Sequence, residues 1–141
     1  MAILIQKLVH EHGGKTSAFI SHGDHKFEAF VHGSRAELAP RVDTDCMAEM
    51  TFERAVSWRE LPEFDDAQAC IMQSAEVAGA VLVQGRVHNI IERGNDPPLV
   101  DLYLQTGPEF LVIPSEKLDG YIPVVGAGLE VPLVGLCFWL T

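Results

Sequence analysis

The stretch AILIQKLVH at residues 2–10 returns later in the chain as AVLVQGRVH at residues 80–88. Five of the nine positions are identical, and two more exchange Ile for Val. Apolar residues alternate with other residues in both stretches, and this period of two is typical of a β-strand with one buried face. The spacing between the two stretches, in a chain of 141 residues, predicts two copies of one small domain.

Later features of the chain recur in the same order. In each half a glycine turn follows the first strand, a Phe-containing strand comes next, and a Trp closes the last apolar run. These markers are Gly13, Phe27 and Trp58 in the first half, and Gly94, Phe110 and Trp139 in the second. We therefore expect a mainly all-β fold with a first barrel at 1–61 and a second at 80–141. An acidic linker at 62–79 connects them as a loop or a short helix, which Asp65 or Asp66 would cap.

The expected strands resemble oligonucleotide/oligosaccharide-binding (OB-like) small barrels. The second half carries this resemblance best, in residues 85–87, 100–104, 110–116 and 131–140. Within it, Phe110–Leu118 is similar to the middle strand and Ser-containing turn of tandem TOBE-type molybdate-binding barrels, which implies an oxyanion ligand. Ser74-Ala75-Glu76 does not supply the polar signature that precedes the first strand in that family, and position 86 is Arg where the first copy has Leu8.

Charge and cysteine content restrict the classes of partner. Twenty acidic and ten basic residues give a formal charge of −10, which disfavours nucleic-acid binding without excluding it. Three cysteines (Cys46, Cys70, Cys137) without a CxxC pair or a secretion signal indicate reduced thiols and a cytoplasmic location. The longest apolar run, Val131–Leu140, reaches about half of a membrane-spanning length and contains Pro132, so we expect no membrane association.

Histidines concentrate in the first half of the chain. His10, His12, His22 and His25 are the candidate metal ligands, because imidazoles so placed could bind zinc or copper. The alternative is that they are polar residues of strands and turns, since no cysteine or further histidine motif completes a closed set of four ligands.

Matching polar residues on the two first strands are candidates for ligand binding. Gln6 and His10 correspond to Gln84 and His88, and Tyr103 is a candidate exposed aromatic residue for stacking. The same pairs also fit the solvated face of a strand.

Catalytic patterns are weak, so no enzyme is indicated and no cofactor is expected. No Gly-x-Ser-x-Gly elbow occurs, and Ser21, His22 and Asp24 cannot converge if they alternate along one strand. The leading hypothesis is a non-catalytic binding or assembly protein that contacts a protein partner or a second copy of itself. Its expected assembly surface is the apolar last strand, with Val131, Leu133, Leu136 and Phe138. An OB-like module for single-stranded nucleic acid or a saccharide, and a metal or oxyanion binder, are the alternatives.

Overall fold

The computed structural model describes residues 1–105 and 108–141, and most of them lie in β-strands. One unit is a closed barrel with the strand order β1-β2-β3-β12-β4. We call it barrel one. Its strands are β1 (Ala2–His12), β2 (Lys15–His22), β3 (His25–His32), β4 (Asp45–Thr51) and β12 (Cys137–Leu140).

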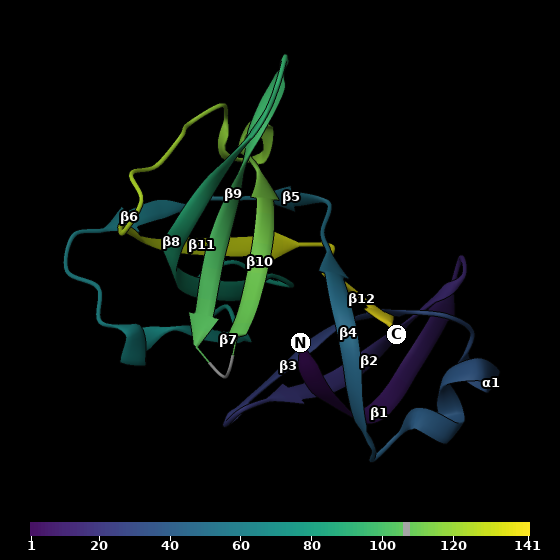
Figure 1. The fold of residues 1–141 in the computed structure, drawn as a ribbon. Coiled ribbons are helices and arrows are strands. Elements are labelled where there is room, and N and C mark those ends of the chain that lie inside the picture. Colours follow the sequence, from purple (N-terminus) through teal and green to yellow (C-terminus); the bar gives the residue numbers. More distant parts are fainter. Residues whose placement is uncertain (106–107) are drawn as a thin grey trace.

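The second unit is a sheet with the order β10-β9-β8-β11-β5, which β6 joins by pairing with β11 and β7 by pairing with β8. We call it sheet two, and it lies beside barrel one (Figure 1). Its strands are β5 (Arg54–Ala55), β6 (Arg59–Leu61), β7 (Cys70–Gln73), β8 (Val81–Arg93), β9 (Asp96–Gln105), β10 (Pro108–Pro114) and β11 (Gly128–Val134). The expected all-β architecture with two units is confirmed.

The two units exchange strands, so the division into 1–61 and 80–141 does not describe them. Strand β12 leaves sheet two and enters barrel one, where Cys137 pairs in parallel with Phe30 on β3 and in antiparallel with Thr51 on β4. In the opposite direction, the segment after β4 enters sheet two, where Ala55 pairs with Leu133 (Figure 1). The two halves of the chain have similar strands in the same order, and this order would be the same with or without strand exchange. The sequence pattern therefore could not reveal the exchange.

Short helical turns connect the strands. They are α1 (Arg35–Leu38) and the 3₁₀ turns η1 (Ala39–Arg41), η2 (Asp66–Gln68) and η3 (Ser115–Leu118). The linker expected at 62–79 holds η2. Asp65 caps the N-terminus of η2, because its side chain accepts a hydrogen bond from the Ala67 amide at 3.0 Å. Among the residues that the structure describes, no helix has the length and apolar character needed to cross a bilayer.

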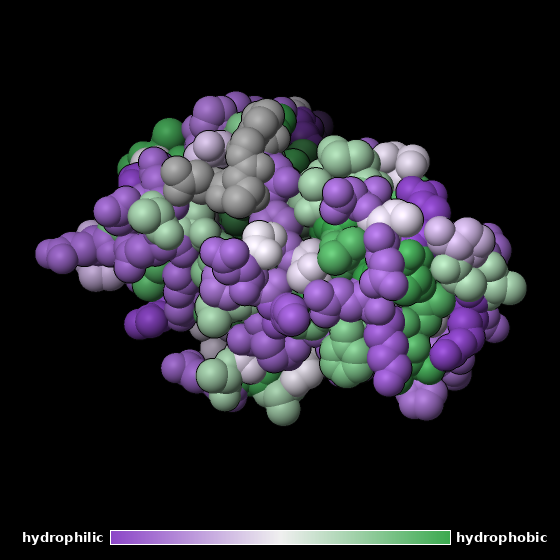
Figure 2. Space-filling model, turned by 90° about the horizontal axis from the view of Figure 1, so that it is seen from below, coloured by the Kyte–Doolittle hydropathy of each residue, from purple (hydrophilic) through white to green (hydrophobic). Residues whose placement is uncertain are grey.

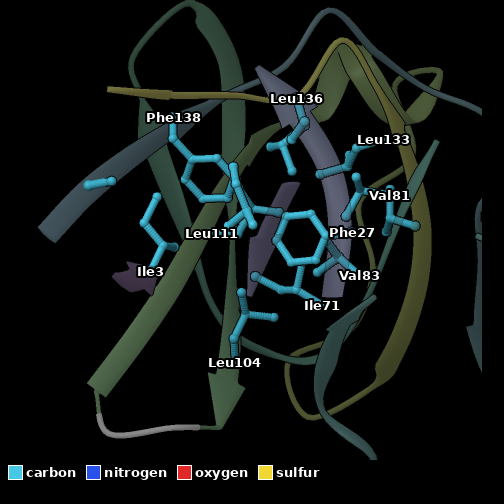
Figure 3. Close-up of a cluster of buried hydrophobic side chains, with 14 of the residues drawn as sticks. Ile3, Phe27, Ile71, Val81, Val83, Leu104, Leu111, Leu133, Leu136 and Phe138 are labelled. Atoms are coloured by element: carbon cyan, nitrogen blue, oxygen red, sulfur yellow. The ribbon is translucent and has the colours of Figure 1, made fainter. Parts of the chain in front are cut away.

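One hydrophobic core serves both units. Ile3, Phe27 and Phe138 of barrel one belong to the same buried cluster as Leu104 and Leu111 of sheet two (Figure 3). Neither half of the chain would bury a core of this size alone, because small domains leave a large share of their surface exposed. The two units are therefore halves of one packed structure.

Strand β8 needs a glycine where it passes β9. A Cβ on Gly85 would lie 2.6 Å from the Tyr103 carbonyl oxygen on β9, which is closer than real Cβ atoms approach. The matching residue of β1 is Lys7, which is exposed. This close approach of β8 and β9 explains why the two otherwise similar strands differ here.

Polar contacts also join the units. The His22 Nε2 atom at the end of β2 lies 2.7 Å from the Glu109 Oε2 atom on β10, and both side chains are largely buried. Glu109 Oε1 accepts a hydrogen bond from the Ala2 amide at 3.2 Å, and Gln73 Oε1 accepts one from the Glu28 amide at 3.0 Å. Because these partners are far apart in sequence, the contacts fix how the units sit together.

We predict that Phe138→Ala lowers the free energy of unfolding by about 3–5 kcal/mol, because it leaves a cavity where a fully buried ring packs. Urea unfolding followed by Trp fluorescence measures the change. The loss should appear as one cooperative transition, since the core is shared. Met47→Ala on β4, where the side chain is exposed, is the control and should leave stability nearly unchanged. Equal effects of the two substitutions would contradict the assigned place of β12.

A second prediction concerns the polar contacts that hold β6 and β8 against β11. Glu130 accepts hydrogen bonds from Arg59 Nε at 2.6 Å and from Gln84 Nε2 at 2.7 Å. The hydrogen bond from Arg59 is the main cause that lowers the pKa of Glu130, which outweighs the opposing effect of burial. A lowered pKa in the folded state adds stability above the ordinary pKa of Glu, and this stability is lost as the pH falls through the lowered value.

Glu130→Gln should therefore cost about 1 kcal/mol at neutral pH and make stability less sensitive to acid. Chemical unfolding at about pH 7 and at about pH 3 measures both effects. Glu49→Gln, at an exposed position on β4, is the matched control. An unchanged acid dependence in Glu130→Gln would show that this carboxylate does not contribute as described.

Candidate functional site

A cavity of about 250 Å³ lies in barrel one where β3, α1 and η1 meet β12. We call it the barrel-one cavity. Its lining mixes one cation, one carboxylate, aromatic rings and aliphatic side chains. The lining residues are His32, Gly33, Glu37, Leu38, Arg41, Trp139 and Leu140. Its small volume suits a compact ligand.

Local sequence fixes the acidic side of the barrel-one cavity. Ser34 and Glu37 form a capping box: Ser34 Oγ accepts a hydrogen bond from the Glu37 amide at 3.1 Å, and Glu37 Oε1 accepts one from the Ser34 amide at 3.2 Å. The Ser34 hydrogen bonds lower the pKa of Glu37. Glu37 is therefore an ionised carboxylate held in one orientation at neutral pH.

An aromatic stack forms another wall. The His32 and Trp139 rings lie with centroids 3.8 Å apart and planes 14° from parallel. Trp139 Nε1 donates a hydrogen bond to Thr51 Oγ1 at 2.8 Å, which fixes the indole. Trp139 belongs to the exchanged strand β12, so this wall exists only when the end of the chain is docked in barrel one.

Arg41 supplies the positive charge of the barrel-one cavity. Most other arginine side chains donate hydrogen bonds to carboxylates, to backbone carbonyls or to both within the protein. These are Arg35, Arg59, Arg86 and Arg93. Within the described residues, the side chains of Arg41 and Arg54 make no hydrogen bond or ion pair. Of these two, only Arg41 lines the cavity. Its guanidinium group is available to a ligand.

The predicted ligand residues are divided between the two units. Gln6 and His10 lie on β1, and the His10 amide donates a hydrogen bond to Ser17 Oγ. Gln84 and His88 lie on β8, where Gln84 is already bound to Glu130. That Gln6 and His10, and likewise Gln84 and His88, bind a ligand stays a prediction.

The structure does bring His88 close to Tyr103. Their ring centroids lie 6.5 Å apart, and the Phe110 ring lies 5.0 Å from His88 and 5.4 Å from Tyr103. Nearby, burial raises the pKa of Asp101, and its Oδ1 atom has no hydrogen-bond partner in the described structure. Phe110 is 39% exposed. This aromatic cluster is a second, shallower candidate surface.

The predicted metal site is not assembled. His10 and His12 are exposed on β1, whereas His22 is buried against Glu109 and faces His25 across the β2–β3 hairpin. Among the residues described, no three or more His, Cys, Asp or Glu side chains are grouped so that they could hold a metal ion. These four histidines lie in the strands of barrel one, as the alternative explanation expected of polar strand and turn residues.

The predicted assembly surface is wrong, because its residues form the core. Val131, Leu133, Leu136 and Phe138 are all buried. Strand β11 lies between β8 and the pair β5 and β6, and β12 lies between β3 and β4. Both strands are therefore internal, and the apolar residues at 131, 133, 136 and 138 are buried in the core rather than part of an open surface.

The cysteines carry no site in the described structure. Cys46, Cys70 and Cys137 are unpaired thiols. Burial raises the pKa of Cys70 and of Cys137, which keeps these thiols protonated and weakly reactive.

Sequence reasoning missed His32, Glu37 and Arg41 as parts of one site. The S-x-x-E pattern at Ser34–Glu37 signals a helix start and could have indicated a turn that positions Glu37. No local signal could place Trp139 beside His32, because their contact depends on strand exchange.

Comparisons with known proteins support the fold. No protein-family model matches the chain, and no curated protein matches it. Among solved structures it is similar to the cytoplasmic molybdate-binding protein ModG, crystallised with molybdate bound, with a TM-score of 0.53 and 14% identity. The match covers 97% of this chain and 92% of that chain. The chain therefore shares the two-unit β fold of ModG, and the resemblance to TOBE-type barrels is confirmed as a likeness of fold.

Proposed function

We propose that this protein is a non-catalytic binding protein for a small oxyanion, which it holds in the barrel-one cavity. The observation that carries the proposal is Arg41, a cationic residue that lines this cavity and whose side chain makes no hydrogen bond or ion pair within the described residues. Guanidinium groups bind tetrahedral oxyanions through directed, charge-assisted hydrogen bonds. The fold likeness to a protein that binds molybdate supports the same class of ligand.

The rest of the barrel-one cavity adds selectivity. His32 can donate a ring N–H toward a bound anion, and the Trp139 indole limits the space beside it. Glu37 opposes an anion, so binding should be modest and should favour ligands that reach Arg41 without approaching Glu37. The net charge of −10 also repels anions at long range. The binding free energy must therefore come from the local contacts in the cavity.

Arg41→Gln tests the proposal directly. Isothermal titration with molybdate at low salt should detect binding to the wild-type chain and an affinity at least about tenfold lower in the variant, because the charged donor is lost. Arg54→Gln removes the other arginine without a side-chain partner, at an exposed position, and should bind as the wild type does. Absence of binding to the wild type for molybdate, sulfate and phosphate alike would reject the proposal.

Glu37→Gln tests the opposing charge. Gln also completes a capping box, so the turn at Ser34 should remain folded while one negative charge is removed. We expect molybdate affinity to rise about threefold to tenfold, as measured by the same titration. Thermal unfolding provides the control for intact structure. Weaker binding by a variant of unchanged stability would contradict the proposed electrostatics.

Protein binding is a second candidate function, because large apolar side chains are exposed outside the barrel-one cavity. Phe110 and Val112 on β10, and Met47 on β4, are among them. In the view from below, hydrophobic patches interrupt a largely hydrophilic surface (Figure 2). Exposed apolar groups of this kind are used in protein contacts.

The three free cysteines support a reducing compartment, and with it a cytoplasmic location for either function.

A further inference from the structure

Strand β10 forms an open edge of sheet two. It pairs with β9 from Pro108 to Pro114, and it stands last in the strand order. No strand of the described chain pairs with its other side. Open edges present backbone donors and acceptors that another extended chain can use.

Barrel one shows what occupies the corresponding edge in the other unit. There the third strand, β3, pairs in parallel with β12 through Phe30 and Val31. In sheet two the strand that would take this place is β5, which has only the residues Arg54 and Ala55 and pairs with β11 alone. In sheet two this strand is therefore present but too short to cover the edge of β10.

A groove lies beside β10. It has a volume of about 370 Å³ and is bounded by residues 109–112 of β10, by Met1 just before β1, and by residues 48–50 within β4. We call it the β10 groove. Its lining residues are Met1, Ala48, Glu49, Met50, Glu109, Phe110, Leu111 and Val112.

The lining of the β10 groove combines apolar side chains with the two carboxylates of Glu49 and Glu109. Phe110 is 39% and Val112 is 43% exposed, while Leu111 between them is buried. Glu49 is exposed, and within the described residues its carboxylate makes no hydrogen bond or ion pair. Glu109 is occupied by His22 and the Ala2 amide, so it contributes charge rather than a free acceptor.

We propose that the β10 groove binds an extended segment of a partner protein that lies along β10 as β12 lies along β3. The partner segment carries apolar side chains toward Phe110 and Val112 and basic side chains toward Glu49, an alternation that a β-strand provides. The charge of −10 on the chain favours a basic partner. This inference is independent of the oxyanion proposal, because the two sites share no residue.

The ends of β10 limit the length of the paired segment. Pro108 and Pro114 bracket the strand and have no amide hydrogen to donate. The backbone amides of β10 that can donate to a partner are therefore confined to residues 109–113. A short linear motif fits this edge, whereas a long sheet extension does not.

The test uses the full chain and a fluorescein-labelled peptide of about nine residues that alternates Lys with Val. Fluorescence anisotropy at low salt should show binding, and nuclear magnetic resonance should shift the amides of residues 109–113. Val112→Glu and Glu49→Lys should each weaken binding at least about tenfold. Phe19→Glu on β2 is the matched control, because Phe19 is also 43% exposed, and it should bind the peptide as the wild type does.

Each other outcome overturns the proposal. Absence of peptide binding, or equal binding of a peptide with Glu in place of Lys, would remove the basic extended partner. An equal loss in Phe19→Glu would mean nonspecific attraction. If sedimentation showed that the wild-type chain dimerises and that Val112→Glu prevents it, the occupant would be a second copy instead. Molybdate titration of Val112→Glu separates this test from the oxyanion proposal, since Val112 lies outside the barrel-one cavity.

Discussion

The crossing of two chain segments between the units is the constraint on which the structure depends. The segment after β4 passes the segment after β11, and the Glu53 amide donates a hydrogen bond to the Val134 carbonyl oxygen at 3.0 Å. Gly135 is required here: its φ is +73°, and a Cβ would lie 2.5 Å from Glu53 Cγ. On either side, Lys117 Nζ donates to the Glu53 carbonyl oxygen at 2.6 Å, and the Phe30 amide donates to the Leu136 carbonyl oxygen at 3.0 Å. The crossing is thus tied to both units.

The exchange makes the parts of the molecule depend on each other. Barrel one closes only with β12, and β12 also brings Trp139 to His32 in the barrel-one cavity. On the other side, the short β5 leaves β10 with an open edge beside the β10 groove. The barrel-one cavity therefore depends on the longer exchanged strand, β12, and the open edge beside the β10 groove depends on the shorter one, β5.

Much of the fold could be predicted from the sequence because strand formation leaves a local signal. The alternation in residues 2–10 and 80–88 marked β1 and β8, the glycine turns marked the hairpins, and Asp65 marked the cap of η2. The partner of each strand leaves no such signal. For Val131 to Phe138 the apolar pattern was read as an exposed surface, although the apolar residues at 131, 133, 136 and 138 are buried in the core. The candidate site was missed for the same reason, since Arg41 and Trp139 meet only through long-range pairing.

The position of β12 in barrel one also has a consequence for the order in which the protein is made. Residues 1–51 contain the other four strands of this barrel, and they leave the ribosome first. The place between β3 and β4 stays unfilled until Cys137–Leu140 has been synthesised. Barrel one therefore closes only after every described strand of sheet two has been translated, although four of its five strands precede them in the chain.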